Sequence, residues 1–156
     1  MSLLPLFRWF DASYIGATIR GSTELFPIIE FVHLLGLVTL LGSIVVVDMR
    51  LLGIGLRRQS VSEVAAQFAP VTVTGIVMML ASGVLLFLSE ALKCYDNDAF
   101  WVKMEFLAAA ILFYATIHRK VTASDKPRPI LGAITALLSL TLWFGVGWAG
   151  RAIAFV

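Results

Sequence analysis

Residues 27–47 read PIIEFVHLLGLVTLLGSIVVV, and Glu30 and His33 are the only ionisable side chains in this run. As an α-helix, a run of this length at about 1.5 Å per residue covers the roughly 30 Å hydrocarbon core of a bilayer. Three further apolar runs of similar length follow at 70–89, 100–117 and 130–149. Because open strands cannot satisfy their backbone hydrogen bonds in lipid, we predict four membrane-spanning helices.

The composition of the whole chain agrees with this prediction. Of its 156 residues, 60% are hydrophobic and only 14% are charged, whereas an ordinary soluble domain has about 25% charged residues. So few charged groups could not cover the surface of a soluble globule. The composition therefore disfavours a soluble enzyme, a nucleic-acid-binding protein and a disordered chain. The expected surrounding is a lipid bilayer, and no glycine-rich phosphate loop or Cys-x-x-Cys motif suggests a soluble activity.

Small and weakly polar residues recur every three or four positions along each run, and such residues mediate helix contacts in lipid. They predict an all-α, integral membrane four-helix bundle with up-down-up-down topology and short connections. The predicted inward faces are His33, Gly36, Leu40, Ser43 and Val47; Thr72, Gly75, Met79 and Ser82; Met104, Ala108, Ile111, Ala115 and His118; and Ala136, Ser139, Trp143, Gly147 and Gly150.

The signals at the helix ends complete this division of the chain. Pro70 and Pro129 are predicted to lie at helix starts, where a missing N–H costs nothing. The cluster Asp96-Asn97-Asp98 supplies a loop and a possible N-cap for the third helix. Residues 1–26 place apolar side chains at near-helical spacing between charged ones, which predicts an amphipathic helix in the outer membrane interface. We therefore expect an interfacial segment, 1–26, and a four-span domain, 27–156.

The distribution of basic residues predicts the orientation, because positive loops stay in the cytoplasm. Segments 48–69 and 118–129 carry most of the basic residues near the spans and are expected to face the cytoplasm of a bacterial inner membrane. Both termini and the 90–99 loop then lie outside. The basic residues of the two cytoplasmic loops are Arg50, Arg57, Arg58, Arg119, Lys120, Lys126 and Arg128.

A homo-oligomer is expected, because four short spans expose much surface. Gly42, Gly83 and Gly145 offer sites at which another helix can approach closely.

Ionisable residues at membrane depth are candidates for function, because each costs about 2.5–3.5 kcal/mol to insert even on lenient scales. One group falls within a single layer near the outer face, and its alternative explanation is interfacial salt bridging and snorkelling. Its members are Glu30, His33, Lys103, Met104, Glu105 and Arg151. His118 ends the third run at the opposite face, about 20 Å from His33 in depth, so one haem cannot bridge the two. Asp48 and Arg50 are expected to form a local ion pair.

Several motifs resemble a family of uncharacterised bacterial four-span membrane proteins. They are FPIIEFVHLLG at 26–36, DMRLLG at 48–53, FWVK at 100–103 and GRAIAF at 150–155. An early histidine, a glycine one turn later, an arginine after it and a lysine opening the third run are also distantly similar to two other groups. These are the CopD-like copper-resistance membrane domains and the HemJ-type b-haem proteins. The resemblance implies His33 as a metal or haem ligand and Lys103 as its neighbour.

The leading hypothesis is a protein that binds b-type haem, or a related redox metal centre, near its outer face for electron transfer, with a possible redox partner. His33 would be an axial ligand, Glu30 would orient its ring, and Met104 is a possible second ligand. Lys103 and Arg151 would neutralise the haem propionates.

Two alternatives stay open at this point. The same outer cluster could handle copper or another small cation through His33 and Met104. The protein could also be a non-catalytic structural or assembly subunit without a cofactor. His118 is a secondary candidate for a site residue, and the sequence assigns no enzymatic reaction.

Overall fold

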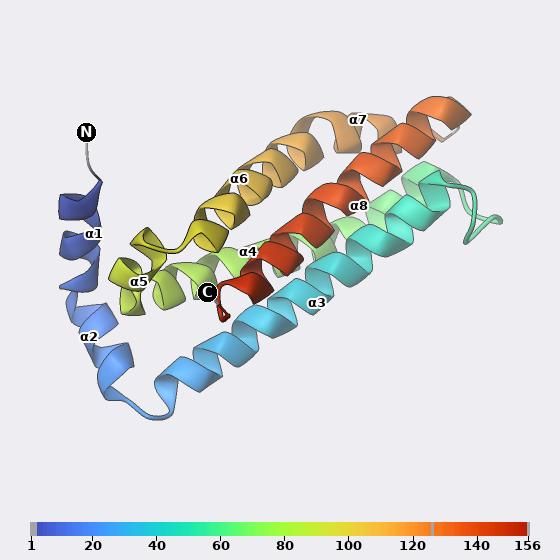
Figure 1. The fold of residues 1–156 in the computed structure, drawn as a ribbon. Helices are drawn as coiled ribbons and strands as arrows, with labels where there is room; N and C mark the ends of the chain where they lie inside the picture. The colour runs from blue at the N-terminus through green and yellow to red at the C-terminus, as the bar shows by residue number, and fades with distance from the viewer. Residues whose placement is uncertain (1–2, 126, 156) are drawn as a thin grey trace.

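A computed structural model of the chain describes residues 3–125 and 127–155 and has four long helices in up-down-up-down order (Figure 1). Each is long and apolar enough to cross a membrane, and the described residues contain no strand. The predicted all-α four-helix bundle is therefore confirmed. The spans are α3 (Leu25–Leu51), α4 (Val61–Ser89), α6 (Asp98–Phe113) with its continuation through the π-helical turn η1 (Tyr114–His118) and α7 (Arg119–Thr122), and α8 (Pro129–Ala152).

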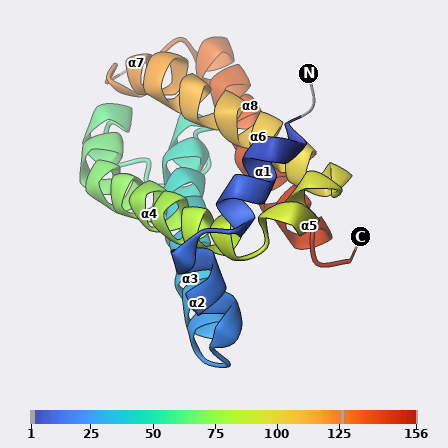
Figure 2. The ribbon, with the colours of Figure 1, turned by 90° about the vertical axis from the view of Figure 1, so that its left-hand side faces the viewer.

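The helices pack in the order α4, α3, α8, α6, because α3 contacts both α4 and α8 while α8 also contacts α6. α4 also contacts the third span, at α7. Figures 1 and 2 show α1, α2, α5 and the C-terminus at one end of the bundle, here called the terminal end. The other end, where the α3–α4 and α7–α8 connections lie, is called the loop end. Lys126 of that last connection lies outside the described residues.

Glycine lets α3 and α4 approach each other closely at the centre of the bundle. A Cβ added to Gly75 would lie 2.8 Å from the backbone nitrogen of Leu40, and one added to Gly36 would lie 2.9 Å from Cβ of Met78. In lipid there is no hydrophobic driving force between helices, so close backbone packing of this kind stabilises the helix pair instead. The buried core beside this crossing consists of Leu40, Ile44, Met79, Ala110, Trp143 and Val146.

The predicted inward faces are correct for α3 and α4, but the face predicted for the third span is correct only in part. Met104, Ile111 and His118 pack inside as predicted, whereas the two alanines do not. Ala108 and Ala115 are exposed, while Ala110 is fully buried. The reason is that the Phe106 ring fills the space above Gly145 on α8, where an added Cβ would lie 2.5 Å from the ring. A large side chain facing a glycine sets the rotation of α6, and a search for small residues on α6 alone cannot detect this.

Two of the three predicted helix-end signals are confirmed. Pro129 lies in the first turn of α8, and the Asn97 side chain caps the start of α6. The start of the second helix at Pro70 is wrong, because a capping box formed by Ser60 and Glu63 begins α4 and leaves Pro70 inside it. The hydropathy pattern detects only the apolar part of this helix. The capping box provides hydrogen bonds to backbone N–H groups at the true N-terminus, which lies more than two turns before Pro70.

The N-terminal segment forms two short helices instead of the predicted single amphipathic helix. These are α1 (Leu4–Asp11) and α2 (Tyr14–Gly21). Ser13 separates them and caps α2 by accepting a hydrogen bond from Gly16. Phe7 and Ile19 are buried, whereas Trp9 is exposed. The segment is therefore amphipathic, and its position in the membrane interface stays a prediction.

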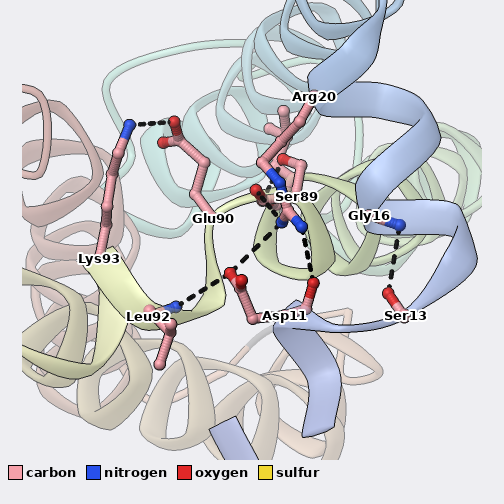
Figure 3. Close-up of polar contacts among 9 residues, drawn as sticks. Asp11, Ser13, Gly16, Arg20, Ser89, Glu90, Leu92 and Lys93 are labelled. Atoms are coloured by element: carbon pink, nitrogen blue, oxygen red, sulfur yellow. Dashed lines mark hydrogen bonds and ion pairs between the residues drawn. The ribbon is translucent and has the colours of Figure 1, made fainter. Parts of the chain in front are cut away.

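Arg20 ties this segment to the bundle (Figure 3). Its guanidinium donates to the backbone oxygen of Ser89 at 2.8 Å and to the backbone oxygen of Asp11 at 2.7 Å, and it also pairs with the Asp11 carboxylate at 3.3 Å. The same carboxylate accepts from the backbone of Leu92 in α5 (Ala91–Tyr95). One arginine thus fixes α1, α2 and the end of α4 together at the terminal end.

The substitution Gly75→Ala is expected to lower the free energy of unfolding by about 1–3 kcal/mol, because the new methyl group would overlap the backbone of Leu40. Gly42→Ala is the matched control, since an added Cβ there meets no atom within 4 Å. Thermal unfolding in detergent micelles measures both. Equal midpoints for the two variants would contradict the close α3–α4 contact.

Candidate functional site

His33 lies on α3 near the terminal end, with its ring against α4. Its Nδ1 is 2.9 Å from the Ser82 hydroxyl, which in turn donates to the backbone oxygen of Met78 at 2.5 Å. The Ser82 hydroxyl has one hydrogen, so it accepts from His33 Nδ1–H and leaves the lone pair on Nε2. Gly83 makes room for the ring, because a Cβ there would lie 3.2 Å from His33 Cε1.

Lys103 on α6 reaches the same part of the bundle. Its ammonium group interacts electrostatically with His33, and its side chain lies along Gly150 of α8, where an added Cβ would be 3.5 Å from Nζ. Lys103 is half-buried and makes no hydrogen bond or ion pair with another residue in the described ranges. The structure therefore places His33 and Lys103 in the same region of the terminal end, from helices that are not adjacent in sequence.

The other predicted members of the outer cluster lie elsewhere. Glu30 and Glu105 are exposed, and Ser82 rather than Glu30 is hydrogen-bonded to the His33 ring. Met104 packs on an aromatic cluster around Phe7 and Phe100 beneath α1. Arg151 is exposed, with its guanidinium 4.7 Å above the centre of the Phe155 ring. Among residues 3–125 and 127–155, no three His, Cys, Asp or Glu side chains are grouped to hold a metal ion.

A second polar cluster lies at the loop end and was not predicted from the sequence. Asp48 Oδ1 and His118 Nε2 are 2.8 Å apart, and both side chains are almost completely buried. Ser139 on α8 faces the same carboxylate. Asp48 therefore pairs with His118 across the bundle, and the expected ion pair with Arg50 is wrong, because Arg50 instead donates to the backbone oxygen of Gln59 at 2.7 Å.

His118, the partner of Asp48, lies where a π-helical turn interrupts the α-helix of the third span. His118 ends the π-helical turn η1, and the ring of Tyr114, one turn earlier, stacks on it with ring centres 5.5 Å apart. Turns of this type are uncommon and recur at functional sites. Ser139 Oγ faces the Asp48 carboxylate but does not meet the geometry of a hydrogen bond with it. Asp48 Oδ2 and His118 Nδ1 are likewise buried without a hydrogen bond in the described part of the chain.

A cavity of about 220 Å³ opens beside this pair, between α4 and the third span. Its lining is mainly alanine and aliphatic side chains from α3 and α4, with Tyr114, His118 and Thr122 on the opposite wall. Asp48 could have been found from the sequence, because it lies four residues after Ile44 on the inward face of α3. It was missed because Asp48 directly follows the apolar run 27–47, and a charged residue at the end of such a run is usually assigned to the connecting loop.

The two candidate sites are separated along the bundle axis. His33 and Asp48 are on the same helix, about 22 Å apart at 1.5 Å per residue. The terminal-end site offers a neutral imidazole lone pair beside an ammonium group. The loop-end site offers a buried carboxylate–imidazole pair next to a cavity.

Fold and sites together define a small multi-pass membrane protein with a polar cluster at each end of its helical bundle. The chain belongs to the DUF6644 family, a family of unknown function, whose sequence model matches residues 6–156. The predicted membership of an uncharacterised family thus agrees with this match. No curated protein and no solved structure matches the chain.

Removing one partner of the loop-end pair is expected to be costly. His118→Ala leaves the Asp48 carboxylate buried without its partner and should lower the free energy of unfolding by about 3–5 kcal/mol. Asp48→Ala leaves an unpaired imidazole and should cost about 1–3 kcal/mol. The double variant should lose less than the two single losses added together.

Unfolding in detergent micelles measures this cycle, with Met49→Ala as the control at an exposed neighbouring position on α3. Strictly additive losses would show that Asp48 and His118 do not interact.

Cys94 on α5 packs against the aromatic cluster at the terminal end. Burial, with the nearby Glu90 carboxylate, raises the pKa of the Cys94 thiol to about 11. Because a raised pKa keeps a thiol protonated, alkylation near pH 8 should be about a hundredfold slower than in the unfolded chain and should accelerate as the pH approaches 11.

Mass spectrometry after N-ethylmaleimide treatment measures this rate, and the same protein in denaturing detergent is the control. Rapid labelling of the folded protein near neutral pH would contradict the burial of Cys94.

Proposed function

We propose that this protein binds b-type haem near the terminal end of the bundle and transfers electrons within the membrane. The observation that supports this proposal is the hydrogen bond between His33 Nδ1 and Ser82 Oγ. It fixes the tautomer with a lone pair on Nε2, which is the form of imidazole that coordinates iron. Ser82 thereby takes the orienting role that Glu30 was expected to have.

The donor set suits haem better than a bare metal ion. The porphyrin supplies most of the iron ligands, so the protein needs to provide only one or two axial groups. A lone histidine meets this requirement. A bare copper ion needs several protein ligands arranged around it, and the methionine expected to help, Met104, packs on the Phe7 cluster.

Lys103 fits the acidic groups of the same cofactor. A half-buried ammonium without an ion-pair partner in the described ranges is costly in an apolar setting, and a carboxylate placed beside it would offset this cost. Haem carries two propionates, and His33 and Lys103 together match its metal and one of these carboxylates. Arg151, at the same end of α8, is available to the other.

The bound haem would supply one-electron chemistry, and the chain would hold it and set its potential. His33 would fix the position of the iron, and Ser82 would fix the direction of the imidazole. The apolar surfaces of the helices would exclude water, which is one of the ways a protein tunes a haem potential. A redox partner would dock at the terminal end, closest to the iron.

The location is part of the same proposal. The basic residues cluster at the loop end, so the positive-inside rule assigns this end to the cytoplasm and the terminal end to the outside of a bacterial inner membrane. Both termini and the 90–99 loop would then be outside. The distant resemblance to HemJ-type b-haem proteins, which rests on His33, the glycine one turn later, a following arginine and Lys103, motivates a cofactor at His33.

The absorption spectrum of the purified protein tests the proposal. We expect a Soret band in the wild-type protein, and its loss in His33→Ala because the iron loses its axial ligand. His118→Gln is the matched control, since it changes the other histidine of the chain and should keep the band. Lys103→Gln should keep the iron but weaken haem binding by about tenfold, the effect of one charge-assisted hydrogen bond.

Two other results would replace the proposal with one of the alternatives. Metal bound without porphyrin and lost in His33→Ala would indicate copper or small-cation handling. Absence of any cofactor in wild-type protein, with His33→Ala differing in stability alone, would indicate a structural or assembly subunit. The mass of the particle in micelles, measured by light scattering, would test the expected homo-oligomer in the same preparation.

A further inference from the structure

The loop-end cavity lies beside the buried His118 imidazole, one of whose two ring nitrogens makes no hydrogen bond in the described part of the chain. His118 is 2% exposed and lines the cavity, and its Nδ1 has no partner in the described part of the chain. Leaving such a group unpaired costs about 1–3 kcal/mol. This nitrogen is itself closed to solvent, so a ligand in the cavity would have to displace a lining side chain to meet it, and that contact would remove the cost.

The pairing with Asp48 allows His118 to meet either a donor or an acceptor. When the imidazole is neutral and its Nε2–H donates to Asp48, Nδ1 accepts a hydrogen bond from a ligand hydroxyl. When the imidazole is protonated, Nδ1–H donates to a ligand carbonyl, and Asp48 stabilises the positive charge. The same atom thus suits the hydroxyl and the carbonyl form of one ligand.

The remaining lining indicates an apolar, planar ring. One wall is made of small side chains on α4, namely Ala65, Ala66 and Ala69, and the opposite wall carries the Tyr114 ring stacked on His118. A cavity of about 150 Å³ holds a benzene ring in another protein, so one of about 220 Å³ holds a substituted ring.

The cavity is accessible from outside the bundle. Ala66 and Arg119, which belong to its lining, are both exposed. It opens between α4 and α7, near the polar end of two membrane-spanning helices. A ligand dissolved in the membrane could therefore insert its head group and leave an apolar tail among the acyl chains.

We propose that the loop-end cavity binds the head group of a membrane quinone or its quinol, with His118 as the hydrogen-bonding residue. A quinone carbonyl matches the protonated imidazole, and a quinol hydroxyl matches the neutral one. The planar ring fits between the alanines of α4 and the Tyr114 ring. This inference stands on the cavity and the Asp48–His118 pair, and it does not depend on haem at His33.

Photolabelling tests the proposal in the full chain reconstituted in lipid nanodiscs. The probe is an azido derivative of a short-chain ubiquinone, and excess unlabelled quinone is the competitor. We expect competed labelling on peptides that line the cavity. Ala69→Phe fills the cavity and should weaken binding at least about tenfold, the effect of losing both the space and the hydrogen bond.

Ala81→Phe is the matched control, because Ala81 lies exposed on the same helix and does not line the cavity. It should bind like the wild type. His118→Gln keeps an amide that can face Asp48 but removes the ring nitrogen, and it should weaken binding without loss of the folded protein. Binding should persist in His33→Ala, which separates this proposal from the one about haem.

Two results would overturn the proposal. Equal labelling of the Ala69→Phe and Ala81→Phe variants would show that the probe only partitions into lipid. Protection of the cavity by added anionic phospholipid, with no competition by unlabelled quinone, would show that the site near Arg119 holds a lipid head group.

Discussion

The close approach of α3 and α4 at Gly36 and Gly75 is the contact on which the His33 site and one wall of the loop-end cavity depend. On the terminal side of this contact, the same pair of helices brings the His33 ring against Ser82. On the loop side, the Thr72 hydroxyl of α4 donates to the Ser43 hydroxyl of α3 at 2.9 Å in the wall of the cavity. A wider separation would break both hydrogen bonds, because neither side chain is long enough to follow its partner.

The sequence was sufficient for the spans because their evidence is local. Twenty or so apolar residues in succession, bounded by polar segments, need no knowledge of neighbouring helices. The inward faces of α3 and α4 were also predictable, because glycine, serine and threonine mark the contact on both helices. In the third span the prediction was wrong for Ala108 and Ala115, and the reason is physical. The rotation of this span is set by Phe106 against Gly145, a contact between a large and a small residue on different helices.

The candidate sites, like the helix faces, could be predicted from the sequence only in part. His33 and Lys103 could be assigned to one layer by counting residues from the helix ends, and the structure brings them close. The hydrogen bond to Ser82 could not be inferred, because it depends on the rotation of α4 about its axis. Asp48 was assigned to Arg50 because the two are neighbours in sequence. Neighbouring positions on a helix face different directions, so Asp48 points to the bundle interior while Arg50 reaches the connection beyond α3.

The separation of the two clusters suggests how such a small bundle could couple two processes. Between them lies a core of Leu40, Ile44, Met79 and Trp143 that is closed to water. These four side chains have no group that can carry a proton. If haem occupied the terminal end and a quinol the loop end, His33 and His118 would hold the two groups at opposite ends of this core. The apolar core would then be part of the function, because it keeps the two sites apart.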